Sequence, residues 1–279
     1  MNTPSATTIV AHYSHGDLLD RLADALRDDG VDPARPTLEQ LAPYDQFHGR
    51  GLEATEEVGS LMPVNAPDRL LDVGSGIGGP ARWFARRFGC RVTGVDLTPE
   101  FCAVAQELSR RTGMASTVEF QVGDALALPF GDAAFDGAYS MNVSMNIADK
   151  AALYREIHRV LSPGGWLLLS EVARGTGPEP DYPTPWAATA ATSFLATPQQ
   201  TRDGLVAAGF EVLRLDSTRE QALAFAARSR AAVDRGEKPP HRAVMLMHGD
   251  VAGPAMRNSG RALAEGRVEP IEVLARKAR

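Results

Sequence analysis

The sequence predicts an α/β fold built on a doubly wound parallel sheet. Short apolar runs recur through the middle of the chain and alternate with segments of helical period. A glycine-rich turn at residues 74–79 follows the apolar run at 69–71, and Pro80 opens a helix directly after it. Carboxylates, Asp72 and Asp96, stand at the ends of the first two runs, where an open parallel sheet binds its ligands.

The expected strands follow one another in chain order. They lie at residues 69–71, 91–96, 118–122, 135–140, 166–171, 210–215 and 268–275. The helix before the fifth strand ends at residues 160–165, where a proline and two glycines break its period. Thr197 and Pro198 mark the N-cap and the first position of a later helix, which Gly209 ends.

The first 65 residues are not needed by such a sheet, and we predict that they form a helical cap. Leucines recur at helical spacing through residues 17–26, and a second short helix is expected at 37–41. Residues 43–51 mix polar and aromatic side chains without an amphipathic period, which suits a lid over a pocket. A helix at 54–61 then leads into the first strand.

Two insertions are expected on the substrate side of the main domain, residues 66–279. The first, at 173–197, carries Tyr182, Trp186 and Phe194 between prolines. A long loop of this kind is usually functional, so these aromatic side chains either form pocket walls or pin the loop to the core. The second insertion, at about 219–265, is expected to be helical.

Composition and charge narrow the classes of function. The chain carries 29 Lys and Arg against 35 Asp and Glu, and this net charge of −6 argues against a nucleic-acid footprint. It has no secretory signal and no run of eighteen apolar residues, so we expect a cytoplasmic protein without membrane insertion. Cys90 and Cys102 are too few for a disulfide framework, and no spaced set of metal ligands occurs.

Spacing assigns two of the carboxylates to a nucleotide. Asp96 lies about twenty residues after the glycines, the distance at which an acid reaches a ribose diol. Asp124 follows the third strand, where its carboxylate is placed to accept from an exocyclic adenine amine. Dehydrogenases use nearly the same glycine turn, but apolar residues more usually precede it there, whereas this chain has Asp72.

Together these motifs resemble the class I S-adenosylmethionine-dependent methyltransferases over residues 68–172. The shared pattern is an acid, a glycine turn, an acid closing the second strand, Gly-Asp after the third strand, and Leu-x-Pro-Gly-Gly before the fifth. The resemblance implies S-adenosylmethionine as the cofactor. It also implies a Rossmann-like, seven-stranded sheet whose last strand is antiparallel.

The same resemblance assigns the cofactor contacts. It places Asp72, Gly74 and Gly76 at the methionine end, with Asp96 at the ribose, and Asp124 with Ala125 at the adenine. The further cofactor contacts that we expect are Gln46, Ser75, Leu97 and Met141.

The loop after the fourth strand bears on the chemistry of methylation. Several similar sugar and natural-product O-methyltransferases carry His-Met-Pro-Asp-Arg there, with the histidine as base, whereas this chain has Asn146-Ile147-Ala148-Asp149-Lys150. An amide takes no proton at neutral pH, so we expect Asn146 to orient the acceptor. Either His48 in the lid supplies the base, or the acceptor is an amine that needs none. The expected acceptor contacts are Tyr44, Asn142 and Trp186.

Three hypotheses of function follow from these observations. The leading one is a cytoplasmic enzyme that methylates the amine of a small molecule, supported by a looser resemblance to sarcosine/dimethylglycine and phosphoethanolamine N-methyltransferases. The second is O- or C-methylation of a natural product or quinone precursor, with His48 as base. The third is a protein that binds S-adenosylmethionine without turnover. The expected partner is a small-molecule methyl acceptor and not a nucleic acid, while homo-oligomer formation stays open.

Overall fold

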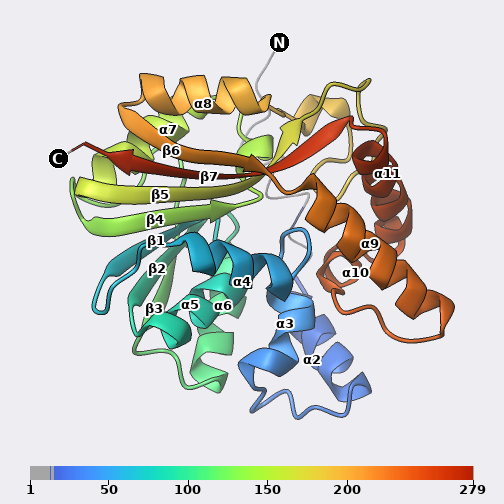
Figure 1. Cartoon of the computed structure of the whole chain (residues 1–279). Helices are drawn as coiled ribbons and strands as arrows, with labels where there is room; N and C mark the ends of the chain where they lie inside the picture. The colour runs from blue at the N-terminus through green and yellow to red at the C-terminus, as the bar shows by residue number, and fades with distance from the viewer. Residues whose placement is uncertain (1–12, 14–15, 279) are drawn as a thin grey trace.

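The computed structural model describes residue 13 and residues 16–278 and is built around one sheet (Figure 1). Its strands are β1 (Arg69–Val73), β2 (Arg91–Asp96), β3 (Val118–Val122), β4 (Phe135–Met141), β5 (Leu161–Arg174), β6 (Phe210–Ser217) and β7 (Val268–Lys277). Their order in the seven-stranded sheet is β3-β2-β1-β4-β5-β7-β6. The first five strands in the chain are parallel, whereas β7 is antiparallel to β5 and β6. The predicted Rossmann-like sheet with an antiparallel last strand is therefore confirmed.

Helices cover both faces of the sheet (Figure 1). On one face lie α4 (Leu52–Leu61), α5 (Gly79–Phe88) and α6 (Pro99–Arg111), which share a buried core with Leu70 and Phe120. On the other face, α7 (Lys150–Val160) and α8 (Pro198–Ala207) pack with Leu71 and Leu167. Successive strand side chains point to opposite faces, so the neighbours Leu70 and Leu71 belong to different cores. Hydrophobic burial on both faces explains why these strands read as nearly continuous apolar runs.

The end of α3 and the start of β5 are the element boundaries that differ most from the sequence-based expectation. The helix α3 (Leu38–Asp45) continues through Pro43 to Asp45, so the first part of the expected lid is helical. A capping box between Thr37 and Gln40 starts this helix, and burial of its apolar face sustains it. The strand β5 begins at Leu161, which pairs with Phe135 ahead of a register shift, and not at residue 166.

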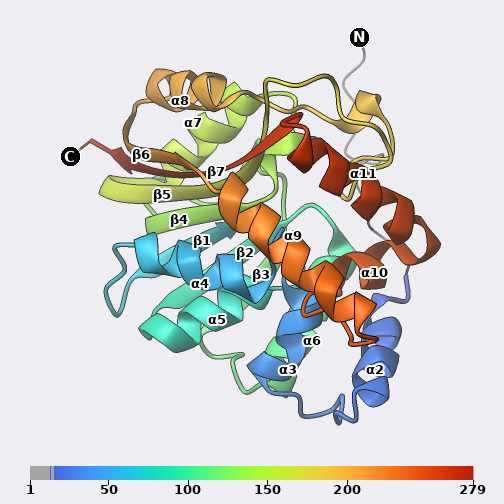
Figure 2. The same ribbon diagram turned by 45° about the vertical axis from the view of Figure 1, so that its right-hand side comes forward.

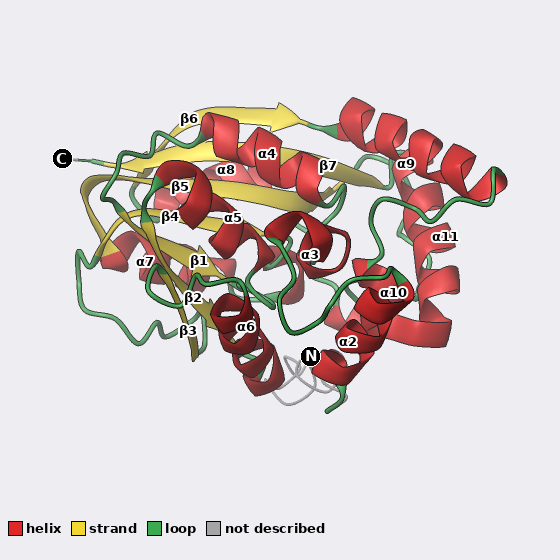
Figure 3. Ribbon diagram, turned by 90° about the horizontal axis from the view of Figure 1, so that it is seen from below, coloured by secondary structure: helices red, strands yellow, loops and turns green. Residues whose placement is uncertain are grey.

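A second group of helices gathers at the carboxyl end of the parallel strands (Figures 1 and 3). Here α2 (Leu18–Asp28), α3 and α10 (Ala243–His248) bury a common apolar cluster against α6. The helices α9 (Arg219–Asp234) and α11 (Ala252–Ala264) lie beside α10 and complete the expected helical region at 219–265 (Figure 2). The short 3₁₀ turns η1 (Ser144–Asn146), η2 (Ala190–Thr192) and η3 (Gly249–Val251) occur in the connecting segments. These elements enclose the end of the sheet at which the predicted ligand residues lie.

Candidate active site

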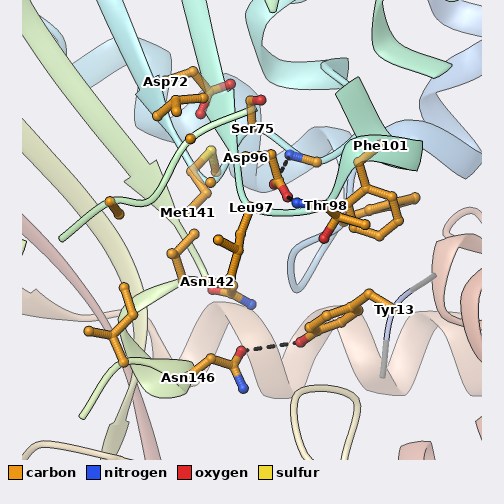
Figure 4. Close-up of a pocket in the computed structure, with 18 of the residues that line it drawn as sticks. Tyr13, Asp72, Ser75, Asp96, Leu97, Thr98, Phe101, Met141, Asn142 and Asn146 are labelled. Atoms are coloured by element: carbon orange, nitrogen blue, oxygen red, sulfur yellow. Dashed lines mark hydrogen bonds between the residues drawn. The ribbon is translucent and has the colours of Figure 1, made fainter. Parts of the chain in front are cut away.

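A cavity of about 250 Å³ lies at the carboxyl ends of β1 to β4 (Figure 4). This is where open α/β sheets bind ligands, because the strand order reverses there and leaves a crevice. Its wall combines the turn after β1, the ends of the next three strands, the lid, and two aromatic residues from distant segments, Tyr13 and Phe194. The cavity therefore joins the predicted cofactor motifs to the added segments of the chain.

The turn between β1 and α5 forms one wall of the cavity. Gly74, Gly76 and Gly78 have φ angles of +75°, +51° and +77°, in the left-handed region that favours glycine. A Cβ atom on Gly74 would lie 2.3 Å from the side chain of Val143. One on Gly79 would lie 2.2 Å from the carbonyl oxygen of the residue that ends α3. The glycines thus permit both the turn itself and the close approach of its neighbours.

Asp96, at the end of β2, braces this turn (Figure 4). Its Oδ2 accepts a hydrogen bond from the Gly76 amide at 2.8 Å, and its Oδ1 accepts one from the Thr98 amide at 2.9 Å. A carboxylate has about four acceptor positions, so each oxygen retains capacity for a ligand donor. The arrangement fits a pair of ribose hydroxyls.

Two buried polar atoms in the wall have no hydrogen-bond partner among the described residues. They are Asp72 Oδ2 and Ser75 Oγ, and both residues line the cavity. Burial raises the pKa of the Asp72 carboxyl to about 8. Buried polar atoms in native proteins almost always have partners, and the ammonium group of S-adenosylmethionine would supply donors to both. The residues present therefore fit this cofactor.

The structure brings together all but one of the expected cofactor residues. Those that line the cavity are Asp72, Gly74, Ser75, Gly76, Asp96, Leu97, Asp124, Ala125 and Met141. Asp124 turns the chain after β3 by accepting from the Leu126 amide at 2.8 Å. The exception is Gln46, which lies outside the lining.

The opposite end of the cavity is formed by residues far apart in the sequence (Figure 4). The Tyr13 hydroxyl donates to Asn146 Oδ1 at 3.1 Å, and Asn146 Nδ2 donates to the carbonyl oxygens of Trp186 at 2.7 Å and Thr192 at 3.3 Å. When the Asn142 side chain is oriented so that its oxygen and its nitrogen both have partners, its oxygen accepts a hydrogen bond from the Gly49 backbone amide at 3.2 Å. The two asparagines therefore connect the loop after β4 to the N-terminal segment, the 173–197 loop and the lid.

His48 lines the cavity, but both of its ring nitrogens lie within hydrogen-bond distance of protein partners. Nε2 lies 3.0 Å from Thr55 Oγ1, and Nδ1 lies 3.2 Å from the carbonyl oxygen of Gly49. The side chain is buried, and burial lowers the pKa of His48 to about 3. The imidazole is therefore neutral at pH 7, and its conjugate acid is strongly disfavoured.

Three expected ligand contacts lie behind the cavity wall. The Tyr44 hydroxyl donates to Asp29 at 2.7 Å. The Gln46 side chain is bonded to Asp45 and Thr55, and the Trp186 indole donates to Ser193 at 3.0 Å. None of the three lines the cavity, which departs from the expectation, because their polar atoms are held by protein partners.

Sequence reasoning gave little weight to other residues of the lining. The sequence places Tyr13 in a polar cluster with His12 and His15, which lie outside the described residues, and Tyr13 itself lines the cavity. Phe47, Phe101 and Ile147 also line the cavity. Apolar side chains of this kind carry no local signal that separates pocket walls from core. Phe194 is the aromatic residue of the 173–197 loop that reaches the cavity.

Comparison with known proteins identifies a shared domain. Residues 71–169 match the family described as "Methyltransferase domain". The chain is 35% identical over 133 residues to "Methyltransferase GfsG" of Streptomyces halstedii, covering 47% of this chain and 48% of that protein. It is 38% identical over 137 residues to "Phosphoethanolamine N-methyltransferase 1" of Arabidopsis thaliana, covering 47% and 28%. The chain thus spans about half the length or less of these curated relatives.

Other similar proteins span different chemistries. An O-methyltransferase, cnsE of Penicillium expansum, is 34% identical over 61% of this chain and 62% of its own. The [4+2]-cyclase SpnF superposes with a TM-score of 0.71 at 24% identity, covering 100% and 98% of the two chains. Phosphoethanolamine N-methyltransferase 2 of Haemonchus contortus, in complex with phosphomonomethylethanolamine and S-adenosylhomocysteine, superposes with a TM-score of 0.71 at 21% identity. The match covers 94% of this chain and 60% of that chain. These structures share the fold of this chain.

No helix in residues 16–278 is long and apolar enough to cross a membrane. In the same part of the chain, no group of three or more His, Cys, Asp or Glu side chains is arranged to hold a metal ion.

Proposed function

We propose, from the premise that this chain belongs to the class I S-adenosylmethionine-dependent methyltransferases, that it methylates the amine nitrogen of a small molecule. One observation carries the choice of an amine. Asn146 stands where similar O-methyltransferases carry a histidine base, and both ring nitrogens of His48 lie within hydrogen-bond distance of protein partners. An amine in its neutral form needs no such base.

The residues of the cavity divide into two functions under this proposal. Asp72, Ser75 and Asp96 would hold the cofactor, which when bound supplies an electrophilic methyl group on a sulfonium. Asn146 and Tyr13 would orient the acceptor at the other end, while the lid excludes water. Holding the reacting atoms in line contributes much of the rate in a direct displacement.

The titratable groups near the acceptor end support the amine. Burial raises the pKa of Tyr13 and lowers that of His48 to about 3. Asp45 is ion-paired with Arg82 at 3.0 Å, and Asp149 caps α7 by accepting from the Ala152 amide. General bases work best when their pKa lies near the operating pH, and the pKa of His48 lies well below neutral pH.

A second candidate is O- or C-methylation with His48 as the base. Its support is that His48 lines the cavity and that similar proteins include an O-methyltransferase and a sterol C-methyltransferase. The non-catalytic alternative, binding of S-adenosylmethionine without turnover, is separated from both by product formation in the presence of labelled cofactor.

The substitution His48→Gln separates the two chemistries. For an amine acceptor, single-turnover methyl transfer should rise with pH toward the substrate's own pKa, and the variant should change the rate by less than about fivefold, because a base contributes roughly 10² or more. For His48 as base, the variant should lose on the order of 10² to 10⁴ in rate. The matched control is His241→Gln, since His241 is also held in the lid region, 2.8 Å from the Gln46 carbonyl oxygen, but does not line the cavity. A large loss confined to His48→Gln would exclude the amine mechanism.

The part of the predicted lid that follows α3, residues 46–51, is expected to respond to the cofactor. It contacts the glycine turn through Phe47, and its Gly49 amide is within hydrogen-bond distance of Asn142. Ligand in the cavity would fix both neighbours, so amide hydrogen exchange in the lid should slow when S-adenosylhomocysteine is added. Exchange in α8, on the far face of the sheet, should not change and serves as the internal reference. Equal lid exchange with and without ligand would contradict a role in closure.

A further inference from the structure

We propose that the acceptor amine belongs to an apolar molecule that carries no phosphate or carboxylate group. This inference rests on the proposed function and adds the class of substrate to it. It also separates this chain from relatives named for phosphoethanolamine and from the structural neighbour with bound phosphomonomethylethanolamine.

The first support is the charge of the cavity wall. Five carboxylate side chains line it, and no lysine or arginine does so among the described residues; the acids are Asp45, Asp72, Asp96, Asp124 and Asp149. The undescribed residues 1–12, 14 and 15 contain no lysine or arginine. An anionic acceptor would find no lysine or arginine in the described lining to pair with.

The cations that border the cavity are already engaged. Lys150 Nζ donates to the carbonyl oxygens of Ser144, Ile147 and Phe194 at 2.8, 2.8 and 2.6 Å. An ammonium group has three donors, so these contacts use all of them. Burial lowers the pKa of Lys150 to about 8, which makes it a weaker counter-charge as well.

Two arginines in or near the lid are paired with acidic side chains. Arg82 has no solvent exposure and is paired with Asp45. Arg50 is 8% exposed and contacts Glu57 at 2.6 Å and Glu272 at 3.5 Å. A buried pair keeps its partners because breaking it leaves an unpaired charge, so neither guanidinium is available to an acceptor phosphate.

The second support is the apolar surface at the acceptor end. Phe47 and Phe101 meet edge to face with ring centroids 5.4 Å apart, and the Tyr13 ring lies 6.0 Å from Phe101. Ile147 and Phe194 complete this part of the lining. Aromatic and aliphatic walls gain from burying an apolar body, and no lysine or arginine of the described lining offers a counter-charge to an anion. An apolar amine satisfies both features.

Binding to the protein saturated with S-adenosylhomocysteine tests the inference without turnover. Phenethylamine and phenylalanine form a matched pair that differs by one carboxylate, and tryptamine with tryptophan forms a second. Calorimetry or ligand-observed NMR should find each amine bound at least about tenfold more tightly than its amino acid, because burying a carboxylate without a counter-charge is unfavourable. Phosphoethanolamine should compete with neither amine. Equal or tighter binding of an amino acid or of phosphoethanolamine, or no binding of either amine, would overturn the proposal.

A charge introduced at the cavity provides the converse test. Ala148 is exposed and lines the cavity, so Ala148→Lys adds a free ammonium there. It should reduce the preference for each amine over its amino acid by about tenfold. Val206→Lys, at an exposed position on α8, is the matched control and should leave the preference unchanged. An unaltered preference in Ala148→Lys would show that wall charge does not select the acceptor.

Failure of the acceptor class and failure of the proposed function give different results. Methyl transfer to phenethylamine from labelled cofactor is measured separately from binding. A protein that binds the amines selectively but labels only alcohols or carbon acids overturns N-methylation and leaves the charge selection intact. A protein that methylates amines but prefers those with a carboxylate overturns the acceptor class alone.

Discussion

Replacing Asp96 by asparagine should weaken the binding of S-adenosylhomocysteine about ten- to a hundredfold. The carboxylate accepts from the amides of Gly76 and Thr98, so an asparagine must turn its NH₂ group toward one of these donors. The substitution also removes the charge from the hydrogen bonds that remain for the ribose. A hydrogen bond to a charged group contributes roughly 1.5 to 3 kcal/mol, which corresponds to this loss of affinity.

Isothermal titration with S-adenosylhomocysteine measures this effect directly. Glu211→Gln is the matched control, because Glu211 is an exposed acid on β6, at the far edge of the sheet. The control should bind as the unsubstituted protein does, and circular dichroism should show that both variants fold. An Asp96→Asn protein that folds and binds within twofold of the original would remove Asp96 from the cofactor site.

Local sequence patterns predicted the sheet, and most of the residues that they assigned to the cofactor line one cavity. Asp72, the glycine turn and Asp96 belong to one strand, turn, helix and strand unit, in which the backbone itself fixes where the side chains lie. The pairing of Asp72 with Gly94 and of Val73 with Val95 brings the two strand ends together, so their spacing in the sequence was sufficient. Asp124 followed from the same argument at the next strand.

The acceptor end was less predictable, because contacts distant in the sequence build it. Tyr13 and Asn146 are hydrogen-bonded although 133 positions separate them in the sequence. No local pattern around either residue predicts this contact. Tyr44 and His48 lie four residues apart, yet only His48 lines the cavity, because α3 extends to Asp45 and turns Tyr44 toward α2. Composition alone did not reveal this longer helix. The pairing of buried Arg82 with Asp45 was likewise invisible, although it fixes where the lid begins.

Substituting Arg82 by methionine should lower the free energy of unfolding by about 3 to 5 kcal/mol, the range found when one partner of a buried ion pair is removed. Arg82, on α5, has no solvent exposure. Its Nη2 donates to Asp45 at 3.0 Å and to the Ile77 carbonyl oxygen at 2.8 Å, and its Nη1 donates to the Ala105 carbonyl oxygen at 3.2 Å. One guanidinium therefore joins α3, α5 and α6. Methionine fills much of the volume but leaves the Asp45 carboxylate buried without its counter-charge.

Urea unfolding of single and double variants separates this charge effect from loss of packing. Asp45→Asn combined with Arg82→Met removes both charges, so the double variant should be less destabilised than the sum of the two single variants. Arg86→Met is the matched control on the same helix, since its ion pair with Glu39 is largely exposed and should contribute less than about 1 kcal/mol. Strictly additive losses would mean that Arg82 acts through its contacts with backbone carbonyls. Because Asp45 ends α3 directly before the lid, a coupled loss should also weaken S-adenosylhomocysteine binding in Arg82→Met but not in Arg86→Met.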